Sequence, residues 1–182
     1  MTDEINKEWL IRALREATEE VCSTMLGVRP EPEEPYDDGE TGPHVDGVVS
    51  LIGLAGNWVG AGSLCCNSRT ACDLSSRLLM SESAAVDEEV LDAIGELTNM
   101  IIGNFKNGIE ERLGPMGLSI PAVISGHDFR ARSMSGKQWL VAPFRVAGNR
   151  LEVRVCLARQ ARPESGTRPT GESPAELRTQ PA

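Results

Sequence analysis

The chain has 182 residues, 40% of them hydrophobic and 4% aromatic, and a formal net charge of −9. That charge disfavours a nucleic-acid surface, which needs concentrated Lys and Arg, and the sequence has no such run. Nor does it contain an apolar stretch approaching the roughly 20 residues of a membrane span, and its acidic start, MTDEINKEW, is unlike a signal peptide. We therefore expect a soluble, cytoplasmic protein with neither a nucleic-acid partner nor a membrane anchor.

The first half of the chain predicts a helix, a loop and a pair of strands. Residues 5–26 place apolar side chains at steps of three and four, and Gly27 supplies a stop. The acidic, Pro-rich stretch 28–46 predicts a solvated loop that could hold a short edge strand. Two apolar runs, 47–56 and 57–66, predict strands joined by a tight turn.

Two further helices are expected in the middle of the sequence. Asn67 or Ser68 can cap a short helix over residues 69–80. Asp87 can cap the longest helix of the chain, residues 87–113. The short helix has one apolar side, whereas the long one presents both an apolar stripe and a distinct polar face.

The last third predicts strands and a tail. Residues 118–126 read as one strand, and 138–146 and 150–158 as a closing hairpin around the turn AGN. Beyond these strands the composition becomes polar and Pro-rich, which is typical of disorder. We expect one domain over residues 1–159 and a disordered Pro-rich tail over 160–182.

Five cysteines form an odd set without CxxC spacing. Adjacent Cys65 and Cys66 on a strand would point to opposite faces, so they are poorly placed to bind one tetrahedral metal. We expect small buried apolar residues in a reducing compartment rather than a disulfide or a metal site. The full set is Cys22, Cys65, Cys66, Cys72 and Cys156.

The polar face of the long helix raises a question about glycine. An outward Glu and Asn three residues apart are ordinary, but an interior helical glycine costs about 1 kcal/mol relative to Ala, and two of them lie on or near this face. Close approach by another molecule would explain both glycines. The face and its neighbours comprise Asp92, Gly95, Glu96, Asn99, Gly103 and Lys106.

The chemistry open to this face is narrow. A lone carboxylate is too few for a metal site, and Asn does not titrate, so a self-contained hydrolase is disfavoured. The amide of Asn99 can hold a water molecule, and Glu96 can bind a cationic side chain. Such a surface is suited to completing the active site of another protein, and phosphoryl transfer fits because its loose transition state needs positioning and charge stabilisation.

Three segments, VVSLIGLAGNWVGAG, DEEVLDAIGELTNMIIGNFKNGI and LSIPAVISG, resemble the CheC/CheX/FliY family of chemotaxis phosphatases, most closely its CheX branch. The family's hallmark of an Asp or Ser, a Glu, an Asn and a distant Pro is matched by Asp92, Glu96, Asn99 and Pro121. The resemblance spans about residues 3–158. It implies an α+β fold in which long helices pack on an antiparallel sheet.

The resemblance also implies roles for these residues. Glu96 would contact a lysine of a phosphorylated CheY-type receiver domain, and Asn99 would position the attacking water. The motif's other members, Asp92 and Pro121, would be structural; Asp92 is also a candidate partner contact, with Gly95, Gly103 and Lys106. The protein would need no cofactor of its own, because the receiver would supply Mg²⁺. One ExxN copy favours the CheX branch and therefore a homodimer.

Two other functions remain open on the same surface. The domain could dock on receivers without catalysis, or it could be a structural partner in a flagellar switch or a two-component complex. Stimulated dephosphorylation of a receiver would separate catalysis from both.

Other residue patterns carry less chemistry. His127 and Asp128 form an HD pair, but a metal site would need more ligands, so we expect a turn. Neither Ser133 nor Ser135 has a histidine partner in a known motif, so a serine hydrolase is not supported. The tryptophans, Trp9, Trp58 and Trp139, are expected to anchor the core or an interface.

Overall fold

The computed structural model describes residues 6–39, 44–130 and 138–160. Within them the chain forms three helices and an eight-stranded sheet. The helices are α1 (Lys7–Met25), α2 (Ser68–Leu79) and α3 (Glu88–Leu113). The strands are β1 (Glu31–Pro32), β2 (Tyr36–Asp38), β3 (His44–Gly56), β4 (Trp58–Cys66), β5 (Met116–Leu118), β6 (Ala122–Arg130), β7 (Trp139–Val146) and β8 (Asn149–Arg159).

Each helix begins at a polar cap. The side chains of Asn6, Asn67 and Asp87 each accept a hydrogen bond from the backbone N–H three residues further on. Such bonds satisfy N–H groups that the first turn of a helix leaves without an internal partner. The two caps expected from the sequence, at Asn67 and Asp87, are confirmed, as are the three helices to within about two residues.

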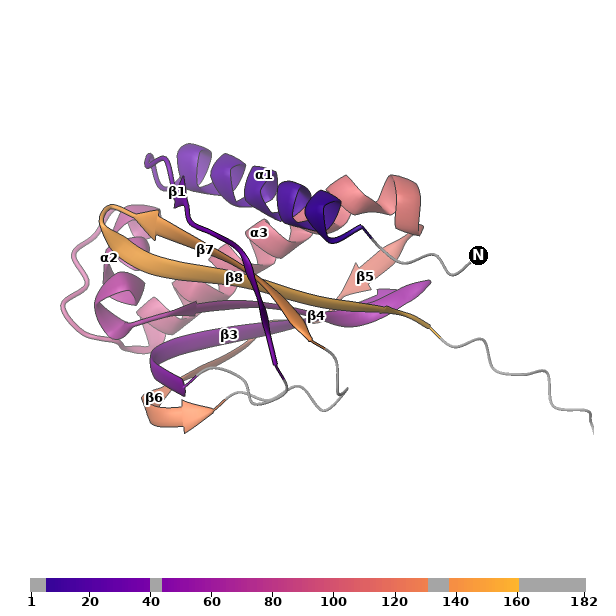
Figure 1. Cartoon of the computed structure of the whole chain (residues 1–182). Helices are drawn as coiled ribbons and strands as arrows, with labels where there is room; N and C mark the ends of the chain where they lie inside the picture. Colours follow the sequence, from indigo (N-terminus) through magenta and orange to yellow (C-terminus); the bar gives the residue numbers. More distant parts are fainter. Residues whose placement is uncertain (1–5, 40–43, 131–137, 161–182) are drawn as a thin grey trace, which may run out of the picture.

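The strands pair antiparallel throughout the sheet. Their order is β1-β7-β8-β4-β3-β5, and β2 also pairs with β7 while β6 also pairs with β3. Figure 1 shows α1 and α3 lying together on one side of this sheet, with β6 beside β3 at the margin away from α1. The expected α+β architecture of long helices on an antiparallel sheet is confirmed.

The main core lies between the helices and the sheet. The apolar stripe of α3 packs onto β3, β4 and β6, while α1 packs against α3 and β7. Full burial of one such large side chain contributes about 1.5–3 kcal/mol, so this layer holds α3 firmly in place. The largest fully buried side chains are Phe105, Phe144, Leu14, Ile52, Leu64, Leu74, Ile94, Leu97, Ile101, Ile102, Ile109 and Leu151.

Two sequence-based expectations about strands have different outcomes. A short edge strand within the acidic loop is confirmed, because β1 and β2 both pair with β7. The prediction of a single strand over residues 118–126 is wrong. It is split into β5 and β6, both paired with β3, and Pro121 lies in the connection between them. Proline has no N–H for a ladder and fits poorly within a continuously paired strand.

The cysteines behave as small apolar residues. Cys65 and Cys66 point to opposite faces of the sheet, because Cys66 belongs to the main core while Cys65 packs with Val49 on the far face. Burial raises the pKa of the Cys22 thiol to about 12 and raises that of Cys66 as well, so both remain protonated and unreactive near neutral pH. None of the five cysteines, all of which lie in the described part of the chain, forms a disulfide.

The remaining expectations concern turns, anchors and the tail. Trp139 is buried, whereas Trp9 and Trp58 are half-buried against the main core, so the anchoring role is confirmed. His127 and Asp128 lie within β6 rather than in a turn between elements. No helix in the described part of the chain is long and apolar enough to cross a membrane. The expected tail, from residue 161 on, and the serines at 133 and 135 lie outside the described residues.

Candidate functional site

The polar face expected on α3 is exposed. Asp92, Glu96 and Asn99 are all exposed, whereas Ile94 and Leu97 beside them are buried. This orientation follows from the helical period, because the apolar residues at steps of three and four must face the sheet. The fold therefore presents the Glu and the Asn together on one turn of a helix whose other side is fixed in the core.

Glu96 and Asn99 are also unengaged. Neither side chain takes part in a hydrogen bond or an ion pair within the part of the chain that the structure describes, and the same holds for Asp92. Their hydrogen-bonding groups are therefore available to an incoming molecule without breaking an existing contact. An amide offers both a donor and an acceptor, and a carboxylate offers only acceptors.

Gly95 does not lie on the outward face, so that part of the sequence-based expectation is wrong. It is buried, and a Cβ at this position would meet the Val123 side chain at 3.3 Å and that of Pro121 at 3.9 Å. The close approach that explains this glycine is made by the chain's own β6 and the connection before it. Gly103 is half-buried, and a Cβ there would meet only Leu118, at 3.8 Å.

Lys106 is occupied by a structural contact. Its ammonium group lies 2.8 Å from Glu110, and the same carboxylate oxygen accepts a hydrogen bond of 2.8 Å from the backbone N–H of Met116. The bond from Lys106 and then that from Met116 lower the pKa of the Glu110 carboxyl. Lys106 and Glu110 thus tie the end of α3 to the start of β5.

One residue beside this face was missed by the sequence analysis. Ile120, in the connection between β5 and β6, is 90% exposed. The alternation expected for a continuous strand assigned it no special place. The only available signal was its position immediately before Pro121, which favours an extended conformation in the preceding residue but does not indicate exposure.

A second polar cluster was also missed, on the far face of the sheet. Arg154 is only 3% exposed, and its guanidinium lies 2.9 Å from carboxylate oxygens of both Asp38 and Glu152. Glu152 also accepts a hydrogen bond of 2.9 Å from the hydroxyl of Tyr36. Burial alone would raise the pKa of Glu152, but the charge of Arg154 and the surrounding hydrogen bonds outweigh it and lower the pKa. The groups satisfy one another, which indicates a structural role.

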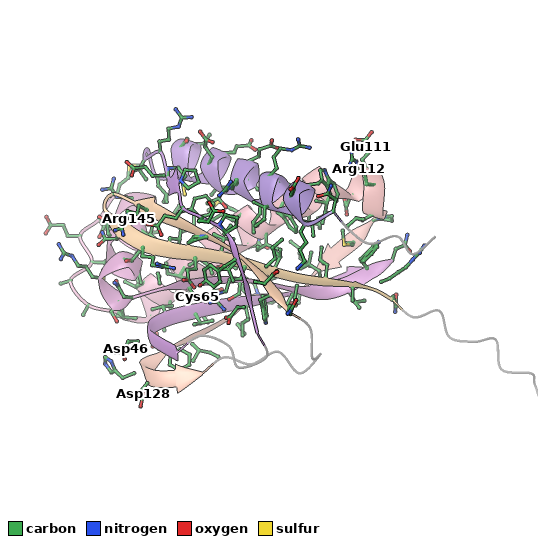
Figure 2. The ribbon with its side chains drawn as sticks, in the orientation of Figure 1. Asp46, Cys65, Glu111, Arg112, Asp128 and Arg145 are labelled. Carbon is green, nitrogen blue, oxygen red and sulfur yellow. The ribbon has the colours of Figure 1, made fainter. Side chains whose placement is uncertain are left out.

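The HD pair has an acidic neighbour in Asp46. One oxygen of Asp46 lies 3.2 Å from Nδ1 of His127 and accepts a bond of 3.1 Å from the backbone N–H of Asp128. Figure 2 shows Asp46, near the start of β3, close to Asp128 of β6, at the opposite end of the molecule from Arg112 of α3. No cluster of three or more potential metal ligands occurs among the described residues.

The sequence matches the family "Chemotaxis phosphatase CheX" over residues 48–145. The chain belongs to the CheX family. The matched region includes all of α3 and the connection that carries Ile120 and Pro121. The family resemblance found in the sequence motifs is thereby confirmed, although the roles of individual residues are not tested by the match.

Three proteins of known name are similar to this chain. CheY-P phosphatase CheX of Thermotoga maritima is 29% identical over 128 residues, covering 68% of this chain and 80% of that protein. Chemotaxis protein CheX of Desulfovibrio desulfuricans has a similar structure, with a TM-score of 0.75 and 25% identity, over 82% of this chain and 99% of that one. CheX from the Borrelia burgdorferi CheX-CheY-BeF3-Mg²⁺ complex gives a TM-score of 0.70 and 26% identity, over 83% and 98% of the two chains.

Proposed function

We propose that this protein is a phosphatase that hydrolyses the aspartyl phosphate of a CheY-type receiver domain, with Glu96 and Asn99 as the residues it contributes to the reaction. The observation that carries the proposal is that these two side chains are adjacent, exposed and unengaged within the described chain, on a helix fixed by a buried core. Membership of the CheX family and the relative named a CheY-P phosphatase support it.

In the proposed reaction the Asn99 amide holds a water molecule in line with the phosphoryl group. The water oxygen forms a bond to phosphorus while the bond from phosphorus to the aspartyl oxygen breaks, and that oxygen keeps the electron pair. A proton of the water passes to a phosphate oxygen, so the products are inorganic phosphate and the free aspartate. Little covalent chemistry is required of the catalyst, because a loose transition state responds mainly to positioning and charge.

Glu96 would form an ion pair with a lysine of the receiver and so orient the two proteins. The receiver would supply the Mg²⁺ that stabilises the developing charge, since the described part of this chain holds no cluster suited to a metal. The complex of a related CheX with CheY, BeF3 and Mg²⁺ supports this division. Charge-assisted contacts of this kind chiefly set orientation and encounter rate.

The decisive experiment follows phosphate loss from a panel of receiver domains, each phosphorylated with acetyl phosphate in the presence of Mg²⁺. We expect the wild-type protein to accelerate decay of at least one receiver and Asn99→Ala to give no acceleration while still binding it. Glu96→Ala is expected to weaken binding of the phosphorylated receiver. Asn107→Ala is a matched control, because it removes another exposed Asn from α3 two turns away.

The outcomes separate the candidate functions. Acceleration that survives Asn99→Ala would contradict the assignment of the water-positioning residue. Binding without acceleration by the wild type would replace catalysis with a receiver-docking module. An assembly that forms equally well with unphosphorylated partners would favour a structural role.

We propose that the protein is a homodimer, as expected for the CheX branch. Light scattering at several protein concentrations tests this directly. A monomeric mass throughout would contradict it.

A further inference from the structure

Ile120 stands out among the exposed apolar residues because of where its backbone is held. A single exposed isoleucine is ordinary on a protein surface and needs no explanation by itself. Ile120, however, belongs to the short connection between β5 and β6, whose flanking residues Leu118 and Pro121 lie against α3. Its 90% exposure is therefore a feature of a fixed segment next to the candidate site.

The connection is fixed by hydrogen bonds to the neighbouring strand. The backbone N–H of Ser119 donates to the carbonyl of Gly53 at 3.0 Å, and the N–H of Gly53 donates to the Ser119 hydroxyl oxygen at 2.8 Å. That hydroxyl donates in turn to the carbonyl of Ile120 at 3.0 Å. Pro121 follows and restricts its own φ and the conformation of Ile120. The Ile120 backbone is therefore held in position before any partner arrives.

The position of this connection along α3 is given by its contacts with two glycines of the helix. Its start, Leu118, lies against Gly103, and its end, Pro121, lies against Gly95. These glycines are two helical turns apart, about 12 Å, and Asn99 lies midway between them in the sequence. Three extended residues span about 10 Å, so the segment containing Ile120 runs alongside the turn that carries Asn99.

We infer that Ile120 is an apolar contact for the receiver domain and helps to determine which receiver this protein binds; the inference rests on the proposed function. A receiver that brings its phosphoryl group to Asn99 must cover the adjacent connection and remove Ile120 from water. Removal of an isoleucine side chain from water favours the complex through the hydrophobic effect. Its rigid backbone reduces the entropy lost on binding, so a receiver with an apolar surface beside its phosphorylation site is favoured.

Ile120 and Asn99 are expected to affect different steps, namely binding of the receiver and the reaction of the bound complex. Ile120 does not reach the reacting atoms, so it is a specificity-determining residue rather than a catalytic one. Its removal should weaken docking without slowing the bound complex. Removal of Asn99 should do the reverse, because the amide acts only on the water.

The test uses the full chain and the same panel of receivers, phosphorylated with acetyl phosphate, and measures both binding and phosphate decay for each. Ile120→Ser is expected to raise the concentration needed for half-maximal acceleration, and the receiver dissociation constant, by about tenfold, with an unchanged maximal rate. Ile120→Val is expected to retain most of the affinity. The matched control is Met80→Ser, which removes an apolar side chain that is 93% exposed at the C-cap of α2.

Equal affinities of Ile120→Ser and the wild type would overturn the inference and leave the phosphatase function intact. Binding that depends on Ile120 without any accelerated decay would overturn the function and keep the inference. No binding to any receiver of the panel would overturn both. If Ile120→Ser instead changes the mass measured by light scattering, a second copy of the chain covers Ile120 and the inference is wrong.

Discussion

Two polar clusters in this protein differ in how many hydrogen bonds and ion pairs their side chains make within the chain. Arg154, on the far face of the sheet, is buried and paired with Asp38 and Glu152. The side chains of Glu96 and Asn99 on α3 are exposed and make no hydrogen bond or ion pair with the described residues. The first cluster has its partners inside the molecule, while the second offers its hydrogen-bonding groups to a partner outside it.

This difference distinguishes polar residues that stabilise the fold from polar residues that serve the function. Burying a charge without a partner is costly, so Arg154 can stay buried only while its carboxylates are present. An exposed Glu and Asn contribute little to the free energy of unfolding, because water satisfies them in the folded and the unfolded chain alike. Substitutions should therefore affect stability at the first cluster and activity at the second.

The largest effect on stability is expected for Arg154→Met. The substitution leaves the partly buried carboxylate of Asp38 without its cation and that of Glu152 with only Arg150 among the described residues, at a cost of about 3 kcal/mol. Urea denaturation followed by circular dichroism measures it. A change below about 1 kcal/mol would mean that the cluster is not the structural unit described above.

Acid should reduce the same contribution. The folded pKa of Glu152 lies below its ordinary value, so the stabilisation is fully present above the unfolded pKa of about 4.3. It is lost as pH falls through the folded value, because the unfolded chain binds the proton more readily. We expect the gap in stability between wild type and Arg154→Met to narrow below about pH 4. A gap that is constant from pH 7 to 3 would contradict this linkage.

Intermediate effects are expected at two glycines of α3. Gly108→Ala should raise the free energy of unfolding by about 1 kcal/mol, because helix propensity improves and a Cβ there meets nothing within 4 Å. Gly95→Ala should fall short of this gain, since its Cβ would lie 3.3 Å from the Val123 side chain. Equal gains, measured by thermal unfolding, would show that the helix and β6 adjust freely.

The smallest effects on stability are expected at the candidate site itself. Asn99→Ala should leave stability unchanged or raise it by about 0.5 kcal/mol through helix propensity, and Glu96→Gln should change it by less than that. Both are measured in the same urea experiment. A loss above about 1 kcal/mol in the free energy of unfolding for Asn99→Ala would indicate that this residue supports the fold. A lower activity of that variant would then no longer indicate a catalytic role.

Local patterns in the sequence were sufficient for most of the elements. The helical period of residues 88–113 and the cap at Asp87 predicted α3 and its exposed Glu and Asn, because burial of an apolar stripe fixes which side of a helix faces outward. The connection between β5 and β6 could not be predicted in the same way. A run of apolar residues does not say where pairing stops, and Ser119 finds its partner in Gly53, 66 residues earlier.

The sequence by itself determined the helices, the closing hairpin, the exposed Glu96 and Asn99, and the family resemblance, because each depends on residues close together in the chain. Tertiary structure alone decided that Gly95 packs against Val123, that Pro121, the neighbour of Ile120, lies against α3, and that Arg154 is buried against Asp38. These depend on segments distant in sequence. Their contacts are set by strand register and by the packing of helix on sheet, neither of which is encoded in a local period.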